Sequence, residues 1–169
     1  RARHLECRVG ENDESSHSCD LRFIRSGGDS VLVVRQDTTE RTRAAARIER
    51  LAYFDTLTGL PNRQQCVDVA QRMIEEALPG DSVAAVFLDL LGFRRINDTF
   101  GHQVGDELIF EAAKRMANIC RSSETFARLS GDEFAIVQPS ATAGGAARLA
   151  ARLCEAMSEP FDLGSGRVY

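Results

Sequence analysis

The pattern of hydrophobic and polar positions divides the chain into two parts with different periods. In the first part, short β-prone runs at residues 4–9, 21–25 and 31–35 alternate with polar turns, which predicts a few antiparallel strands. Three strands without a covering layer do not form a stable domain alone, so we expect residues 1–37 to be the end of a larger domain. A charged, alanine-rich helix capped by Asp37 or Thr38 is expected to follow and to join two domains.

From residue 53 onward, helical periods alternate with strand-like runs, and the sequence contains no internal repeat. The predicted order is helix, strand, helix, hairpin, helix, strand. This order defines an α/β (α+β) fold with a mixed central sheet and flanking helices. Helices are expected at residues 62–77, shortly after residue 89, at 104–120 and at 142–157, with a hairpin at 125–138 and a strand from 161. In the first of these helices, one face carries Val67, Ala70, Ile74 and Leu78. In the helix 104–120, the residues expected to face the core are Leu108, Ile109, Ala112, Ala113 and Met116.

Acidic residues follow two of the strand-like runs. The apolar run Ser82–Leu88 ends abruptly in Asp89, a pattern typical of a strand buried on both faces. The turn Ser130-Gly131 of the hairpin leads directly to Asp132 and Glu133. Such acids can share a divalent cation, and a ligand set made only of oxygen favours magnesium. The alternative that these acids are simply solvated stays open.

The segments after Asp89 have the residue types of a nucleotide site. Leu90 to Phe93 form a strand-to-helix turn, and amides at a helix N-terminus can hold phosphate. A cation at the acids would bridge phosphate oxygens during phosphoryl or nucleotidyl transfer. Asn97 and Asp106 suit a guanine, because a carboxylate accepts hydrogen bonds from its N1–H and its amino group. Equally, Asn97 is a common turn residue and Asp106 a common acid near a helix N-terminus.

Composition narrows the classes of function. The 169 residues are 43% hydrophobic and 27% charged, which suits one globular domain with an appendage. A net charge of −4 argues against a broad nucleic-acid-binding face. No apolar stretch has the roughly 20 residues that span a bilayer, so we expect no direct membrane contact from this chain. Five scattered cysteines without C-x-x-C spacing predict a reducing compartment, the cytoplasm, with Cys66, Cys120 and Cys154 as small buried hydrophobes.

Three blocks of the sequence resemble GGDEF domains, which are diguanylate cyclases. The resemblance covers residues 53–169 and implies a nucleotidyl-cyclase or polymerase-palm fold, truncated before the family's last strands, helix and triphosphate-gripping basic residues. It also implies that two GTP molecules, one on each subunit of a head-to-head homodimer, condense to cyclic di-GMP with loss of two pyrophosphates. The blocks are Asp55-x-Leu57-Thr58-Gly59-Leu60-Pro61-Asn62-Arg63, FLDLLGFRRINDTFGHQVGDE from Phe87 to Glu107, and RLSGDEF from Arg128 to Phe134.

The resemblance also implies residue roles. Asp89, the carbonyl of Leu90 and Asp132 would hold magnesium, with two ions in a complete site. Asp132, beside Glu133, would assist deprotonation of the 3′-hydroxyl. The implied guanine-binding residues are Asn97 and Asp106, and the implied phosphate loop is Leu91, Gly92, Phe93 and Arg94.

This sequence departs from the family pattern at several positions. Ser130 replaces the first signature glycine, where a side chain can crowd the substrate, and Leu91 replaces a usual second Asp. The family's inhibitory product site, R-x-x-D, reads Arg121-x-x-Glu124 here. The departures leave open a degenerate GGDEF domain that binds GTP and regulates an adjacent EAL phosphodiesterase domain without catalysis. With the family's basic end missing, we expect little activity from these 169 residues alone.

The N-terminal part resembles the last strands of a PAS sensor domain. The stretch Arg35–Arg41 is similar to the D-I-T-E-R motif that ends many PAS domains, and residues 38–52 would be the signalling helix after it. The phrase from Met157 to Phe161 is similar to GGDEF domains that precede an EAL domain. These resemblances imply a bacterial signalling protein that is longer at both ends and can carry a membrane anchor elsewhere.

Overall fold

A computed structural model describes residues 3–9, 17–27, 30–139, 142–164 and 166–168. The chain divides into two compact units, residues 1–50 and 51–169. In the described ranges, no helix is long and apolar enough to cross a membrane. The predicted three-part division at residues 37/38 and 52/53 stays a prediction.

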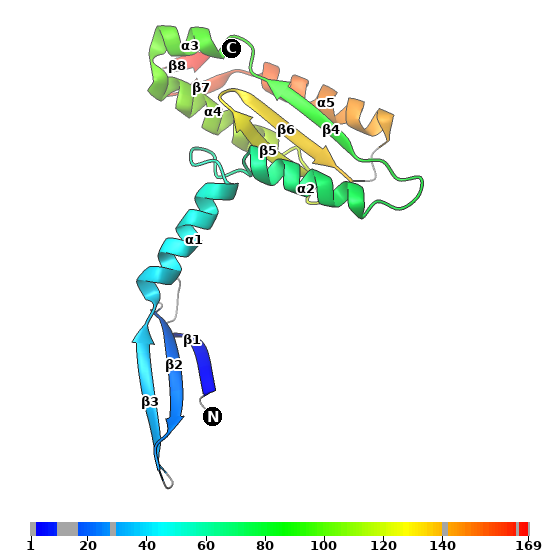
Figure 1. Cartoon of the computed structure of the whole chain (residues 1–169). Coiled ribbons are helices and arrows are strands. Elements are labelled where there is room, and N and C mark those ends of the chain that lie inside the picture. Colours follow the sequence, from blue (N-terminus) through cyan, green and yellow to red (C-terminus); the bar gives the residue numbers. More distant parts are fainter. Residues whose placement is uncertain (1–2, 10–16, 28–29, 140–141, 165, 169) are drawn as a thin grey trace. The chain divides into compact units, whose positions relative to one another are not determined.

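The first unit is a three-stranded antiparallel sheet followed by a helix (Figure 1). The predicted strands are confirmed, although the second starts four residues earlier than expected. Asp37 accepts a hydrogen bond from the backbone N–H of Thr39 at 2.9 Å, so it caps the helix as predicted. The turn predicted at residues 26–29 lies partly outside the described residues. The elements are β1 (Arg3–Val9), β2 (His17–Arg25), β3 (Val31–Asp37) and α1 (Thr39–Tyr53).

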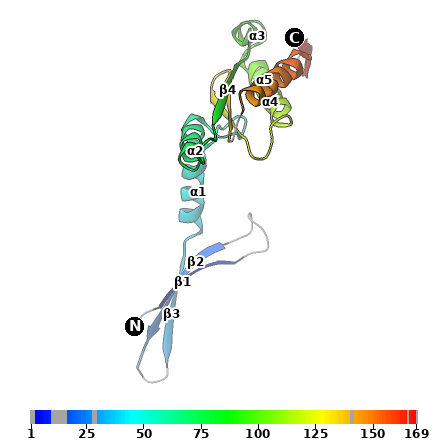
Figure 2. The ribbon, with the colours of Figure 1, turned by 90° about the vertical axis from the view of Figure 1, so that its right-hand side faces the viewer.

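The second unit is built on an antiparallel sheet of order β4-β6-β5, so β4 and β5 run in the same direction on either side of β6. Helix α2 covers one face, and α4 and α5 cover the other (Figures 1 and 2). The α/β arrangement with flanking helices confirms the predicted fold class, whereas the central sheet, expected to be mixed, pairs only antiparallel strands in the described residues. The elements are α2 (Arg63–Glu75), β4 (Ala84–Asp89), α3 (Phe93–Phe100), α4 (His102–Ala117), β5 (Thr125–Ser130), β6 (Glu133–Gln138), α5 (Ala143–Ser158), β7 (Phe161–Leu163) and β8 (Gly166–Val168).

The core follows from the alternation of side chains along β5 and β6. On one face, the rings of Phe126 and Phe134 stack with centroids 5.6 Å apart. The predicted core face of α4 is confirmed, because all five of its expected members are buried against this face. On the other face, alanine and valine side chains of β5 and β6 leave room for α2 to pack through Cys66, Ala70 and Met73.

The prediction of a strand buried on both faces is wrong for residues 82–88. The strand starts at Ala84, and its side chains alternate between half-buried and exposed, with Phe87 72% exposed. The reason is that α2 packs against β5 and β6, whereas the helices of the opposite face cover Val86 and Leu88. A run of hydrophobic residues cannot by itself indicate which faces are covered.

Other expectations need smaller corrections. Val67, Ile74 and Leu78 are each more than half exposed, so the buried face of α2 is rotated by one position from the predicted one, and α2 ends at Glu75. Cys66 is buried as expected, Cys120 is half-buried, and Cys154 is exposed, contrary to the prediction. The single strand expected from residue 161 is the hairpin β7–β8. Helix α4 begins and ends two to three residues earlier than predicted.

Candidate functional site

The acids of the two predicted turns lie at the same end of the sheet. Asp89 is the last residue of β4 and stands opposite Glu133, the first residue of β6. The backbone N–H of Leu90 donates a hydrogen bond to the carbonyl oxygen of Asp132 at 3.4 Å. The structure therefore brings together the residues expected to bind metal, and their roles stay predictions.

The turn that carries Asp132 is tight and shifted in register. Gly131 has φ +46°, a left-handed conformation that favours glycine, and the pairing of β5 with β6 shifts between Arg128 and Ser130. The hydroxyl of Ser130 donates to the carboxylate of Glu133 at 2.7 Å. The guanidinium of Arg63 also reaches this carboxylate, at 3.2 Å. Both partners direct Glu133, and sequence reasoning missed Arg63 in this role.

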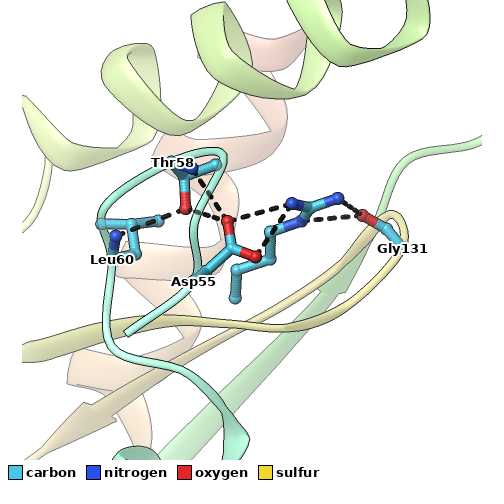
Figure 3. Close-up of polar contacts among 5 residues, drawn as sticks. Asp55, Thr58, Leu60 and Gly131 are labelled. Carbon is cyan, nitrogen blue, oxygen red and sulfur yellow. Dashed lines mark hydrogen bonds and ion pairs between the residues drawn. The ribbon is translucent and has the colours of Figure 1, made fainter. Parts of the chain in front are cut away.

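A single arginine joins the first sequence block to this turn (Figure 3). Arg128 donates to both carboxylate oxygens of Asp55, at 3.0 and 3.1 Å, and twice to the carbonyl of Gly131, at 2.8 and 2.9 Å. Asp55 also accepts hydrogen bonds from the backbone and hydroxyl of Thr58 at 2.8 and 2.7 Å. The side chains of Arg128 and Asp55 are 12% and 22% exposed. The position of the turn therefore depends on a mostly buried ion pair.

The ionisation of Asp55 depends on these contacts. Burial raises its pKa, but hydrogen bonds from Thr58 and Arg128 outweigh burial, so that the pKa lies below the ordinary value of 3.8. The carboxylate is therefore charged at neutral pH, which suits its ion pair with Arg128, whose Nη1 donates to both of its oxygens.

The two residues expected to bind guanine lie on neighbouring helices. Asn97 is on α3 and Asp106 on α4, with Gly101 at φ +85° between the helices. Within the described part of the chain, Asn97 Oδ1 is buried without a hydrogen-bond partner, which is costly for a polar atom. Gly105 lies against it, because a Cβ at this position would collide with the amide of Asn97. Asp106, the next residue, is exposed.

The expected phosphate loop connects β4 to α3. Gly92 adopts φ +81° at the start of α3, and the N–H of Phe93 donates to the carbonyl of Leu90 at 3.2 Å. Leu91 is 98% exposed, and Arg94 projects outward with a weak ion pair to Asp98 at 3.9 Å. A largely apolar cavity of about 480 Å³ lies between residues 86–93 of this segment and α5. The loop thus has open space beside it.

The oxygen atoms that the candidate metal site offers suit a magnesium ion that binds together with a nucleotide. Among the described residues, no three His, Cys, Asp or Glu side chains form a group that could hold a metal ion. Asp89, Asp132 and the carbonyl of Leu90 supply oxygen donors only. Magnesium is commonly held by one or two carboxylates together with substrate phosphates, so these residues fit it without a third carboxylate.

The residues expected for the inhibitory site also lie close together. Glu124 accepts a hydrogen bond from the backbone N–H of Arg121 at 2.8 Å and another from Gln138 Nε2 at 2.6 Å. They line a polar cavity of about 490 Å³ with Arg148 and Arg152 of α5. Sequence reasoning missed these two arginines, although their four-residue spacing places them on one face of a helix.

The fold and the acids at one end of its sheet define a mixed α/β domain with a candidate nucleotide site. Residues 52–165 match the family model "Diguanylate cyclase, GGDEF domain". The chain therefore belongs to the GGDEF family.

Individual relatives agree with this assignment. The chain is similar to MucR of Pseudomonas aeruginosa, a bifunctional diguanylate cyclase/cyclic di-GMP phosphodiesterase, at 37% identity over 151 residues, which are 88% of this chain and 22% of MucR. It is 39% identical to the response regulator PleD of Caulobacter vibrioides over 119 residues, which are 69% of this chain and 26% of PleD. The chain thus spans a minor part of either relative's length.

A solved structure supports the fold directly. The coiled coil and GGDEF domain of DgcB from Caulobacter crescentus, in complex with c-di-GMP, matches with a TM-score of 0.66 at 30% identity. The match covers 75% of this chain and 68% of that one.

Proposed function

We propose that residues 53–169 belong to a diguanylate cyclase module that condenses two GTP molecules into cyclic di-GMP and releases two pyrophosphates. The observation that carries the proposal is the meeting of Asp89, Leu90 and Asp132 at one end of the sheet. Family membership and the cyclase relatives agree with it.

In this proposal, Asp89, the Leu90 carbonyl and Asp132 would hold two magnesium ions, and the chemistry that these ions would supply is neutralisation of charge on the triphosphate. Asp132 would take the proton of the attacking 3′-hydroxyl, with Glu133 as its supporting neighbour. Ser130 and Arg63 both contact Oε2 of Glu133, and these contacts favour one orientation of its carboxylate at the turn.

The base and phosphates of GTP are assigned to the segments after β4. Asn97 and Asp106 bind guanine, with the exposed carboxylate of Asp106 as the acceptor for the N1–H and amino group of the base. Residues 91–94 hold the phosphates through backbone amides and the guanidinium of Arg94. Each subunit of a homodimer supplies one GTP, and Arg121 and Glu124 bind the product as an inhibitor.

The N-terminal unit is assigned a regulatory role. Residues 1–37 are proposed to be the end of a PAS-like sensor domain, and residues 38–52 a signalling helix that passes its state to the cyclase. With GTP as its substrate, the module would act in the cytoplasm of a bacterium, within a longer protein that can include an EAL domain.

The test is a cyclase assay on the protein extended to its natural C-terminus. With GTP and magnesium, we expect cyclic di-GMP, quantified by mass spectrometry. Asp132→Asn is expected to lower the rate at least about a hundredfold, since a metal-bound carboxylate contributes several kcal/mol. Asp68→Asn is the matched control and should retain the rate, because Asp68 is a half-buried acid of α2 that accepts a hydrogen bond from Gln64 Nε2 at 2.8 Å and has no assigned role in the site. Absence of product from the extended protein would overturn the proposal.

A second candidate, a GTP-binding domain without catalysis, is favoured by one contact. The hydroxyl of Ser130 holds Glu133, a bond that glycine at this position cannot make. Calorimetry separates the candidates: GTP binding without turnover, together with turnover gained by Ser130→Gly, supports the non-catalytic domain. Efficient turnover with Ser130 in place eliminates it.

A further inference from the structure

Two cysteines face each other in the first unit. Cys7 on β1 and Cys19 on β2 are direct partners in the antiparallel ladder. Their Sγ atoms lie 2.6 Å apart, and Cys7 Sγ also lies 3.4 Å from the carbonyl oxygen of Cys19. Opposite residues of antiparallel strands have Cα atoms about 4.5–5.5 Å apart, which is within the range of about 4.4–6.8 Å found in disulfides. The backbone is therefore already placed for a bond between them.

The two thiols differ in accessibility. Cys19 is 4% exposed, whereas Cys7 is half-buried at the edge strand β1. A small oxidant can therefore reach Cys7, while Cys19 stays shielded behind it. The other three cysteines lie on or after separate helices: Cys66 on α2, Cys120 after α4 and Cys154 on α5.

We propose that Cys7 and Cys19 form a dithiol oxidation site whose co-reactant is a hydroperoxide. The Cys7 thiolate attacks one peroxide oxygen, the O–O bond breaks, and Cys7 becomes a sulfenic acid; the other oxygen leaves as hydroxide or alkoxide and takes up the proton that the Cys7 thiol lost. The Cys19 thiolate then attacks Cys7 Sγ and expels hydroxide, which leaves as water with the proton of the Cys19 thiol. For hydrogen peroxide, two thiols lose two electrons and two protons, and two water molecules form.

The surroundings of Cys7 slow its oxidation, because they favour the neutral thiol over the thiolate. The hydrogen bond with Cys19 raises the pKa of Cys7, burial and Asp20 act in the same direction, and Arg35 on β3 opposes them. Since the thiolate is the reactive form, oxidation should accelerate as the pH rises. Such a pair responds to sustained peroxide exposure more than to brief exposure.

The site is next to the contacts that hold the start of α1. Ser18, the neighbour of Cys19, donates its N–H to Thr39 Oγ1 at 2.9 Å and accepts from the N–H of Thr38 at 2.9 Å. Asp20, the other neighbour, lies 3.8 Å from the guanidinium of Arg41. A disulfide at Cys19 therefore constrains the strand segment to which the first turn of α1 is attached.

The experiment uses the whole chain with Cys154→Ser, which removes the exposed thiol that can link two molecules. After treatment with hydrogen peroxide and alkylation of free thiols, trypsin cleaves after Arg3, Arg8 and Arg22. We expect the peptides 4–8 and 9–22 to appear joined, two hydrogens lighter than their sum, and to separate with dithiothreitol. The matched control Cys7→Ser should give no joined peptide. Recovery of both peptides unlinked, with Cys7 intact or overoxidised, would overturn the proposal.

Hydrogen exchange gives a second readout that does not depend on cyclase activity. Closing the loop from Cys7 to Cys19 is expected to lower the unfolding equilibrium constant of the first unit about a hundredfold. The amides of Thr38 and Thr42, bonded to Ser18 and Thr38, should exchange more slowly in the oxidised chain. If the disulfide forms and these amides exchange at an unchanged rate, the link to α1 is refuted.

Discussion

The sheets of the two units contain similar hydrophobic residues, but these side chains are exposed in the first unit and buried in the second. Every residue of β3 is exposed, including four consecutive apolar side chains, whereas five of the six residues of β6 are buried. The difference lies in covering layers, because β6 has helices on both faces, while β3 packs only within its three-stranded sheet in the described residues. The comparison shows that hydrophobic residues stabilise a strand only where a second layer buries them.

The largest expected loss of stability comes from removing a buried side chain from the sheet of the second unit, which helices cover on both faces. Phe134→Ala removes a fully buried ring that stacks on Phe126 and should cost about 3–5 kcal/mol in the free energy of unfolding. Val33→Ala, at a side chain 49% exposed on β3, should cost less than about 1 kcal/mol. Hydrogen exchange resolved by unit would measure both, and equal costs would contradict the comparison.

The next largest expected loss of stability comes from removing Arg128, which joins two loops of the second unit. Arg128→Ala leaves Asp55 and the Gly131 carbonyl without their partner and should cost ~2–3 kcal/mol. Arg94→Ala breaks only an exposed contact of 3.9 Å and should change stability by less than about 0.5 kcal/mol. Denaturant titration of the two variants side by side decides whether the Arg128 contacts stabilise the unit.

A tight contact between α3 and α4 should give an effect of similar or smaller size. Gly105→Ala places a methyl group against the Asn97 amide and is expected to cost about 1–3 kcal/mol. Adding Asn97→Ala should recover part of this loss, because the colliding group is removed. The control Gly164→Ala meets its nearest atoms at 3.7 Å and should be near neutral. Thermal unfolding of the single and double variants measures the coupling, and simple additivity would refute the contact.

The smallest expected effect is a loss of stability at acidic pH. The pKa of Asp55 is lowered, so its contribution to stability is complete above the unfolded-state pKa near 3.8 and is lost as the pH falls through the lower folded-state value. Hydrogen bonds from Thr39 likewise lower the pKa of Asp37, at a more exposed site in the first unit. We expect acid to weaken the wild type more than Asp55→Asn when unfolding is followed from neutral pH to below about pH 4. Parallel curves would show that Asp55 has no such role.

The sequence predicted what depends on local pattern. The core face of α4, the hairpin that bears Asp132 and the alternation of helices and strands all follow from spacing between neighbours in the chain. The meeting of Asp89 with the hairpin was also foreseen, because acids at strand ends can converge at one edge of a sheet.

What could not be predicted depends on contacts between distant segments. Arg128 and Asp55 are 73 residues apart, and no local pattern pairs them. The contact of Arg63 with Glu133, 70 residues apart, was missed for the same reason. The exposure of Phe87 depends on the position of α2 over the sheet, and the sequence of β4 carries no information on that position.

The geometry of Arg128 has an evolutionary consequence. Its guanidinium contacts Asp55 with one nitrogen and the Gly131 carbonyl with the other two. A lysine has a single ammonium and cannot reproduce this planar fork, so it would serve one of the two partners and release the other. A substitution at position 128 therefore disturbs two motifs at once, and we expect substitutions at positions 55 and 128 to covary among relatives.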